Sequence, residues 1–350
     1  MLDHAILFQP GDATGPEDRS PMPSPVTWIL TEGLAGTEAP CRGLARALGV
    51  DPVVKRVRIR PPWDWLPGQF WIRPLAAPTA DSDRLTPPWP DLLISSGNAA
   101  APLALAIKSA SRGATRIVHV QTPRVGLDRF DLVVAPQHDG TSGANVIATR
   151  ATLHGLDAQA LAAAAAEWAP VLDHLPRPRL VFLCGGSNGR FKLDPLRIAG
   201  IAASLRRRMH RDGIGVAASA SRRTGAANAA VLRAELAPAG AFVWDGTPPN
   251  PYFGMLALAD AIAVTQDSVT MISEALATGK PVYWIPLAGR SRRLQRFVDL
   301  LTAQGLIRRF PSDDAPLAPW SYDPPDDTQH VAAEIRRRFG WPATGAAETK

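Results

Sequence analysis

Cysteine is nearly absent from the chain, which has only Cys41 and Cys184 among its 350 residues. Neither cysteine belongs to a C-x-x-C pair, and neither stands near a histidine at a spacing typical of zinc sites. This scarcity argues against a disulfide framework and against a structural metal. We therefore expect no metal site. Separately, we expect no bound cofactor.

Long apolar runs are also missing. No stretch approaches the roughly 18 consecutive apolar residues of a membrane-spanning helix. The first residues, MLDHAILFQPGD, lack the basic start, the long apolar region and the small-residue cleavage site of a secretory signal. Both absences predict a cytoplasmic protein, one that is free or peripheral on a membrane.

The chain does have the material for a large core, because 46% of its residues are hydrophobic and its length suits about two domains. Its net charge of +6 favours an anionic partner, such as a nucleotide diphosphate or an acidic lipid headgroup. An arginine-rich composition gives the same surplus by default. No nucleic-acid-binding motif accompanies the charge, so we do not expect nucleic acid as a partner.

The stretch TQDSVTMISEALATGKP, at 265–281, has the pattern of a turn and a helix between two short strands. Asp267 or Ser268 can cap this helix, and Glu274 stands about one turn above its start. A helix N-terminus suits a phosphate, and a carboxylate beside it can accept hydrogen bonds from ribose hydroxyls. The stretch predicts a nucleotide site, with an ordinary capped helix and a solvated Glu274 as the alternative.

Two further turns have a candidate binding role. Gly185, Gly186 and Ser187 directly follow a strand expected at 180–184, and glycine NH groups in such a turn can approach a diphosphate. Ser221 and Arg222 follow a strand expected at 215–220. A guanidinium in that place can bind a phosphate through two parallel hydrogen bonds.

A candidate base follows the strand expected at 130–135, where His138 stands next to Asp139. In doubly wound sheets ligands gather beyond the carboxyl ends of the strands, so this histidine can face a cleft. The alternative is a structural or solvent-facing histidine.

An aromatic segment between prolines, PPWDWLPGQFWIRPL, holds Trp63, Trp65 and Trp71, with Arg60 and Arg73 on its flanks. Aromatic rings beside arginines are typical of side chains that rest at a membrane interface. The segment predicts a peripheral contact with the inner face of the cytoplasmic membrane. The alternative is that these tryptophans pack beneath a long loop.

The runs DSVTMISEA at 267–275 and TGKP at 278–281 resemble the donor-site helix of GT-B glycosyltransferases. The chain as a whole resembles more closely the bacterial relatives of the plant "elongated mitochondria" fission family. The runs that carry this second resemblance are QTPR at 121–124, PQHD at 136–139, SRRT at 221–224, WDG at 244–246, NPYF at 250–253 and DT at 327–328.

This resemblance implies an α/β protein with two Rossmann-like domains that face each other across a cleft. We expect a flexible tail at 1–25, an acceptor-side domain at 26–177 and a nucleotide-donor domain at 178–327. A C-terminal helix, followed by a tail, should occupy 328–350 and pack back on the first domain. The expected donor-site residues are Gly185, Gly186, Ser187, Ser221, Arg222, Asp267, Ser268 and Glu274.

The function that the resemblance implies is an inverting, metal-independent glycosyltransferase, which would move sugar from a nucleotide-diphosphate donor to an envelope glycolipid or polysaccharide precursor. In the resembling enzymes of peptidoglycan lipid synthesis, the glutamate at the place of Glu274 holds the donor ribose. The first loop of GT-B enzymes often supplies the base, a role that falls here to Glu32 or Glu38, since burial in a cleft can raise a carboxylate pKa. The alternative for Glu38 is an ordinary first-turn acid of its helix.

The chain departs from the family pattern in this loop, because Thr37 occupies a place where the family often has histidine. This departure favours a second function, a non-catalytic adaptor that has kept the fold for binding. A third possibility is a sugar-nucleotide epimerase or hydrolase, which shares the architecture. Epimerisation needs an acid and a base around the sugar, and the sequence offers no convincing pair.

Overall fold

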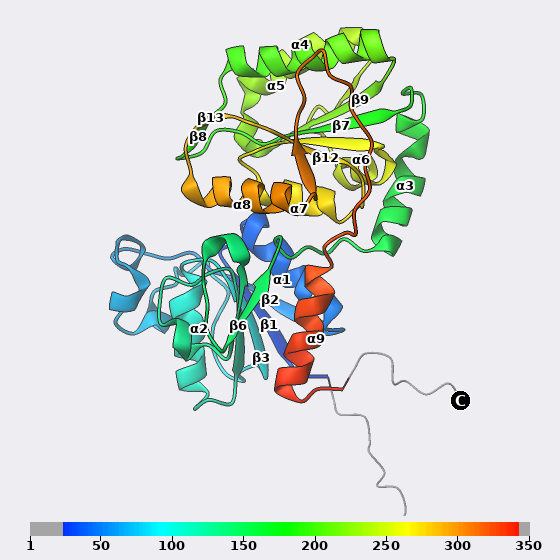
Figure 1. Ribbon diagram of the computed structural model, residues 1–350. Helices are drawn as coiled ribbons and strands as arrows, with labels where there is room; N and C mark the ends of the chain where they lie inside the picture. The colour runs from blue at the N-terminus through cyan, green and yellow to red at the C-terminus, as the bar shows by residue number, and fades with distance from the viewer. Residues whose placement is uncertain (1–23, 343–350) are drawn as a thin grey trace, which may run out of the picture.

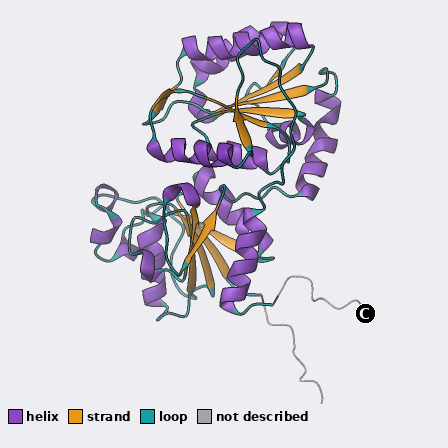
Figure 2. Cartoon of the chain, viewed as in Figure 1, coloured by secondary structure: helices purple, strands orange, loops and turns teal. Residues whose placement is uncertain are grey.

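The computed structural model describes residues 24–342. Most of the tail expected at 1–25 and the end of the chain from 343 onward lie outside the described residues. Within them, Figures 1 and 2 show two α/β domains, one above the other, each with a central sheet and helices on both faces. The predicted α/β class with two Rossmann-like domains is confirmed.

The N-terminal domain is built on a parallel six-stranded sheet in the order β2-β1-β3-β4-β5-β6. Strands β1 and β3 are buried along their whole length, as expected for parallel strands that are covered on both faces. The sheet comprises β1 (Thr27–Thr31), β2 (Pro52–Arg56), β3 (Leu92–Ser96), β4 (Arg116–Val120), β5 (Leu132–Pro136) and β6 (Val146–Thr149).

The C-terminal domain has a second parallel six-stranded sheet, in the order β10-β9-β7-β11-β12-β14. A short antiparallel pair, β8 with β13, lies beside it. The strands are β7 (Arg179–Cys184), β8 (Phe191–Lys192), β9 (Gly215–Ala220), β10 (Phe242–Val243), β11 (Ala261–Thr265), β12 (Val282–Ile285), β13 (Ala288–Gly289) and β14 (Ile307–Arg309).

The order of the C-terminal strands reverses direction between β7 and β11. From β7 the chain moves outward through β9 to β10, and it then returns to β11 on the other side of β7. The carboxyl ends of β7 and β11 therefore flank a topological switch point, which is where doubly wound sheets bind ligands.

Helices cover both faces of each sheet. In the N-terminal domain, α2 packs on one face and α1 on the other. In the C-terminal domain, α4 and α5 cover one face, while α3, α6, α7 and α8 cover the other. The helices are α1 (Ala35–Ala47), α2 (Ala100–Ala110), α3 (Ala158–Leu172), α4 (Pro195–Asp212), α5 (Ala226–Leu236), α6 (Tyr252–Leu258), α7 (Val269–Leu276), α8 (Arg292–Ala303) and α9 (Asp327–Phe339).

Two helices cross from one domain to the other: α3 follows the N-terminal sheet in sequence but packs on the C-terminal domain, and α9 does the reverse. Helix α3 packs against α6, and its Leu172 is fully buried in the C-terminal core, so by packing the domains change before α3 rather than at the predicted Pro178. Helix α9 returns to the N-terminal domain (Figure 1). Its Val331 and Ile335 are buried in the same core cluster as Leu44 of α1. The chain thus crosses between the domains twice.

Candidate functional site

A cavity of about 920 Å³ lies between the two domains. The N-terminal domain contributes Gly36 and Ala39 from the start of α1, which directly follows the carboxyl end of β1. The C-terminal domain contributes the loops after β9 and β10 together with α6 and α7. Four of the predicted donor-site residues line the cavity: Ser221, Arg222, Ser268 and Glu274.

Helix α7 places its polar face in this cavity because its apolar face is fixed in the core. Ile272 and Leu276 are fully buried against the C-terminal sheet, so Thr270 and Glu274 face the other way and line the cavity. The Ser268 hydroxyl caps the helix by accepting a hydrogen bond from the Met271 backbone NH at 3.4 Å. Of the two predicted caps, Ser268 has this role and Asp267 does not.

The Glu274 carboxylate is held by a tyrosine from α6. The Tyr252 hydroxyl donates a hydrogen bond to Glu274 Oε2 at 2.6 Å. Burial raises the pKa of Glu274 to about 7, and the hydrogen bond from Tyr252 opposes that rise. One carboxylate oxygen is fixed in this way, and the other can accept a hydrogen bond from a bound molecule.

The polar groups of the glycine turn after β7 form hydrogen bonds with other parts of the protein. The Gly185 amide donates to Thr265 Oγ1 at 2.7 Å, and the Gly186 amide donates to Asp267 Oδ2 at 3.0 Å. The Ser187 hydroxyl bonds both backbone groups of Leu193. These three predicted residues lie at the switch point, yet in this conformation their groups do not reach the cavity.

Asp267 joins the glycine turn to an arginine at the cavity wall. Its buried carboxylate accepts hydrogen bonds from the Gly186 amide and, at 2.7 Å, from the Thr265 hydroxyl. It also pairs with Arg223 Nη2 at 2.9 Å. The predicted Asp267 is thus a partner of the turn, while Arg223 and the exposed Arg222 line the cavity with positive charge.

The candidate base Glu32 lies in the loop after β1, four residues before Gly36, and it is not among the residues that line the cavity. Its carboxylate is close to Gly97, where an added Cβ would stand 2.6 Å from Glu32 Oε2. Gly97 follows β3, so Glu32 lies beyond the carboxyl ends of two neighbouring strands. Burial raises the pKa of Glu32, which is the direction that a general base at neutral pH requires.

Glu38 is in a different setting, because two arginines bind its carboxylate. Arg56 donates to both of its oxygens at 2.8 Å, and Arg42 donates to Oε1 at 2.8 Å. These contacts, the Arg56 hydrogen bond foremost, lower the pKa of Glu38 to about 2. A carboxylate bound in this way is a weak base, so the geometry favours Glu32 for the role.

His138 is buried at the contact between the domains. Its ring packs 4.9 Å from the ring of Phe297 in α8, measured between centroids. Burial lowers its pKa to about 4, so the ring is neutral at physiological pH. The neighbouring Asp139 accepts hydrogen bonds from Thr122 at 2.8 Å and from Arg293 Nη2 of α8 at 3.0 Å. This setting makes His138 a packing residue of the domain contact.

Sequence reasoning missed the bond between Tyr252 and Glu274 and the part that α5 and β10 play in the cavity. Arg233 of α5 and Trp244 after β10 both line it. Tyr252 belongs to the NPYF run, and this run was the only signal that could have drawn attention to it. Its distance of 22 residues from Glu274 gives no hint of contact.

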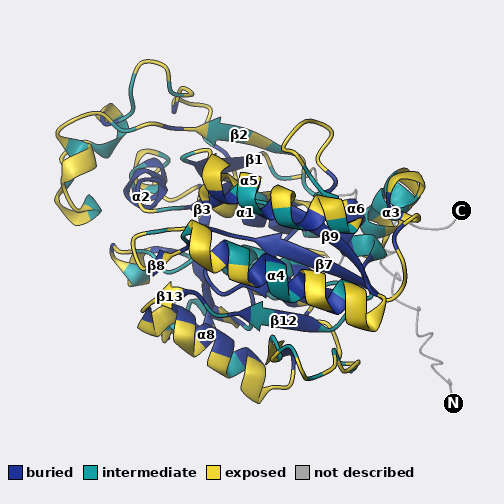
Figure 3. Ribbon diagram, turned by 90° about the horizontal axis from the view of Figure 1, so that it is seen from above, coloured by how far each residue is buried: buried dark blue, intermediate teal, exposed yellow. Residues whose placement is uncertain are grey.

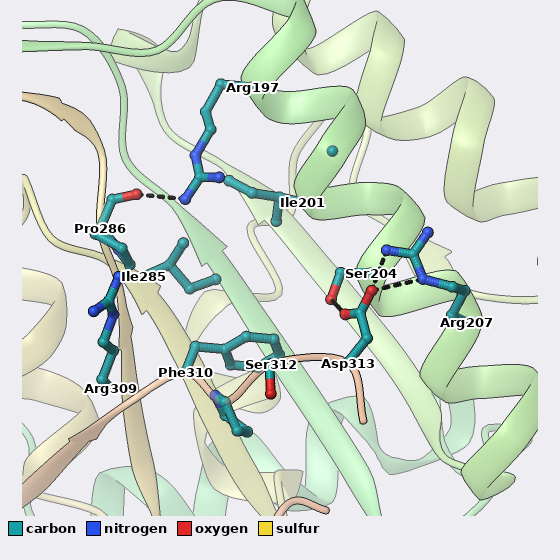
Figure 4. A pocket seen from close by; sticks show the side chains of 12 residues that line it. Arg197, Ile201, Ser204, Arg207, Ile285, Pro286, Arg309, Phe310, Ser312 and Asp313 are labelled. Carbon is teal, nitrogen blue, oxygen red and sulfur yellow. Dashed lines mark hydrogen bonds and ion pairs between the residues drawn. The ribbon is translucent and has the colours of Figure 1, made fainter. Parts of the chain in front are cut away.

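A second cavity, of about 650 Å³, lies on the C-terminal domain between α4 and the chain after β14 (Figure 4). Ser204 and Arg207 both bind Asp313 there, and Arg197 donates to the Pro286 carbonyl at 2.7 Å. It contains no predicted site residue.

Within residues 24–342, no group of three or more His, Cys, Asp or Glu side chains is placed to hold a metal ion. In the same part of the chain, no helix is long and apolar enough to cross a membrane.

Comparison with solved structures shows the fold. A UDP-GlcNAc 2-epimerase from Methanocaldococcus jannaschii, in complex with UDP-GlcNAc and UDP, aligns with a TM-score of 0.50 and 11% identity over 89% of this chain and 99% of that one. MurG of Acinetobacter baumannii aligns with a TM-score of 0.49 and 13% identity over 89% of this chain and 100% of that one. The alignment with the epimerase shows that the chain has a GT-B-like fold.

Sequence comparison shows the family. The model described as "Mitochondrial fission ELM1" matches residues 35–339. An uncharacterized protein of Rickettsia prowazekii is 26% identical over 285 residues, which are 71% of this chain and 79% of that protein. The mitochondrial fission protein ELM1 of Arabidopsis thaliana is 31% identical over 281 residues, which are 72% of this chain but only 65% of the plant protein. The chain belongs to the mitochondrial fission ELM1 family.

Proposed function

We propose that the cavity between the domains binds a nucleotide-diphosphate sugar and that the protein transfers the sugar to an acceptor. The observation that carries this proposal is Glu274, a carboxylate one turn above a capped helix N-terminus in a cavity that also contains Arg222. The free oxygen of Glu274 accepts hydrogen bonds from the ribose hydroxyls, while the first turn of α7 and the arginine face the diphosphate.

The chemistry that we assign is an inverting transfer without a metal ion. Arg222, Arg223 and the NH groups of α7 stabilise the negative charge that develops on the leaving diphosphate. Glu32, whose pKa is raised by burial, takes the proton of the acceptor hydroxyl as that oxygen attacks the sugar carbon from the opposite face. An envelope glycolipid or polysaccharide precursor is the acceptor class, and the nucleotide donor places the reaction in the cytoplasm.

Calorimetric titration with UDP, GDP, ADP and CMP tests the donor site. We expect selective binding by one nucleotide, and an affinity about ten- to a hundredfold lower in Glu274→Ala, because charge-assisted hydrogen bonds to the ribose are lost. The matched control is Glu167→Ala on the exposed face of α3, which should bind like the wild type. Equal affinity in a folded Glu274→Ala variant would remove this residue from the site.

A non-catalytic adaptor is the second candidate, and two observations favour it. Thr37 offers no imidazole in the first loop, and the amides of Gly185 and Gly186 are already bonded to Thr265 and Asp267. If a folded protein binds none of the four nucleotides, the adaptor replaces the enzyme as our proposal. If a nucleotide binds, the release of free nucleotide from its sugar conjugate in the presence of acceptor lipid extract separates the enzyme from a binding protein.

A further inference from the structure

The segment between β2 and β3 carries a cluster of exposed apolar side chains. Trp65, Leu66, Phe70 and Ile72 are 76, 43, 60 and 80% exposed, and we call these four residues the apolar tip. The segment projects at the left of the lower domain in Figure 1, and much of it is coloured as exposed in Figure 3. Single exposed apolar residues are normal on a protein surface, but a cluster of this kind marks an interaction site.

Two tryptophans brace the segment from inside. Trp63 Nε1 donates to the Ile72 carbonyl at 3.0 Å, and Trp71 Nε1 donates to the Leu66 carbonyl at 3.0 Å. Trp71 also packs against the core beneath α2. Of the three tryptophans expected at a membrane, only Trp65 therefore points outward, while Trp63 and Trp71 fix the backbone that presents the apolar tip.

Arginines surround the apolar tip. The Arg60 guanidinium lies 5.2 Å from the centre of the Trp63 ring and donates to the Ala76 carbonyl at 2.8 Å, which closes the base of the segment. Arg73 and Arg129 line an adjoining hollow of about 580 Å³. Among residues 24–342, the guanidinium groups of Arg73 and Arg129 form neither an ion pair nor a hydrogen bond. Asp64 is the one acidic residue between Arg60 and Arg73.

We infer that the apolar tip inserts into the surface of an anionic lipid bilayer. Trp65, Phe70 and Ile72 leave water for the boundary between headgroups and acyl chains, a depth that single loops and amphipathic segments reach. Arg73 and Arg129 then meet phosphate groups, which attract juxtamembrane cations. Trp63 and Trp71 already hold the backbone of the segment before binding, so insertion costs little further backbone conformational entropy. This surface does not depend on the proposed donor chemistry.

Sedimentation with vesicles, without any nucleotide, tests the inference. Wild-type protein should bind vesicles of phosphatidylcholine with one quarter phosphatidylglycerol. Trp65→Ser combined with Ile72→Ser should lower the partition coefficient by at least about tenfold, because two large apolar side chains no longer leave water. The matched control is Leu196→Ser on α4, where an 85% exposed leucine lies in the other domain and should not matter.

The charge is tested separately. Arg73→Gln combined with Arg129→Gln should lower binding to the anionic vesicles about tenfold and leave the weak binding to pure phosphatidylcholine unchanged, because each basic side chain near an anionic surface contributes a severalfold factor. All altered side chains are outside the core, so thermal unfolding should match the wild type and confirm that the variants fold.

Three results would overturn the inference: wild-type protein that ignores both vesicle types, unchanged binding by the Trp65→Ser, Ile72→Ser variant, or an equal loss in Leu196→Ser. A wild-type dimer that this double variant converts to a monomer, with no vesicle binding, would assign the apolar tip to a second copy of the chain. Nucleotide binding is measured apart from these assays, so failure here leaves the donor site standing.

Discussion

At the scale of single residues, Glu274 combines a ligand-facing carboxylate with an environment that keeps it half protonated near neutral pH. Its pKa is raised to about 7 by burial, with the Tyr252 hydrogen bond as the opposing influence. In the unfolded chain the same group has a pKa of 4.5. The folded state thus holds this proton more tightly, so its contribution to the free energy of unfolding is complete below pH 4.5 and is lost as the pH rises through 7.

The same titration predicts how nucleotide affinity changes with pH. Only the ionised carboxylate accepts two ribose hydrogen bonds, so affinity should rise about tenfold between pH 6 and pH 8 as the ionised fraction grows. Calorimetry in matched buffers measures this rise. Glu274→Gln should bind more weakly and show no such rise, and a variant that retains the wild-type pH profile would assign the titration to another group.

Single residues were predictable from the sequence where one element decides their position. Glu274 faces the cavity because the periodicity of α7 sends Ile272 and Leu276 into the core. Glu38 was not predictable in the same way, because its partner Arg56 lies on the next strand and only the fold brings them to 2.8 Å. Contacts between separate elements depend on packing, which sequence periodicity does not record.

At the scale of elements, the turn after β7 is fitted tightly against the loop after β9. A Cβ added at Gly186 would stand 2.0 Å from the Arg223 carbonyl oxygen, and one at Gly185 would stand 2.3 Å from Asp267 Oδ1. Glycine is therefore required at Gly186 by the close approach of two backbones, and at Gly185 by the buried Asp267 side chain. The sequence indicated a glycine turn at a switch point, but it did not reveal that the neighbouring loop fills the space.

This close approach predicts a sharp difference between two glycines of one loop. Gly186→Ala should lower the free energy of unfolding by about 1 to 3 kcal/mol, because the backbone of Arg223 has to move. Gly189→Ala should stay within about 0.5 kcal/mol of the wild type, since nothing lies within 4 Å of its added Cβ. Urea unfolding of both variants measures the difference, and equal stability would show that the loop after β9 yields freely.

Most strands and helices were predictable because apolar runs and helical periodicity are local. The strand expected at 215–220 is β9 as observed, and the last helix begins at Asp327, one residue before its predicted start. The short pair β8 and β13 was not predicted, because two-residue strands leave no pattern.

At the scale of the whole molecule, one ion pair ties α8 of the C-terminal domain to the loop after β5. Arg293 pairs with Asp139, whose side chain is only 7% exposed, and His138 packs on Phe297 beside it. Arg293→Ala should lower the free energy of unfolding by about 1 kcal/mol, because the Asp139 carboxylate loses its partner. Arg296→Ala, an exposed arginine on the same helix, should change it by less than about 0.5 kcal/mol.

Urea unfolding compares these two arginine variants directly. Equal losses of stability in both would mean that the general charge of α8 matters rather than its bond to Asp139. The sequence could not predict this tie, because Arg293 and Asp139 are 154 residues apart. The two-domain class was expected from the length of the chain and from its resemblance to a family, whereas the contacts between the two sheets were not predictable.

The return of α9 to the first domain determines the order in which the protein can be completed during synthesis. The C-terminal sheet, its helices and the chain after β14 that packs on them come from one continuous stretch, so that half can close once Tyr322 has left the ribosome. The N-terminal half begins first, yet the surface of α1 that contacts α9 stays uncovered until Val331 and Ile335 arrive. The domain that is begun first is therefore finished last, and until then its open surface is a natural target for chaperones.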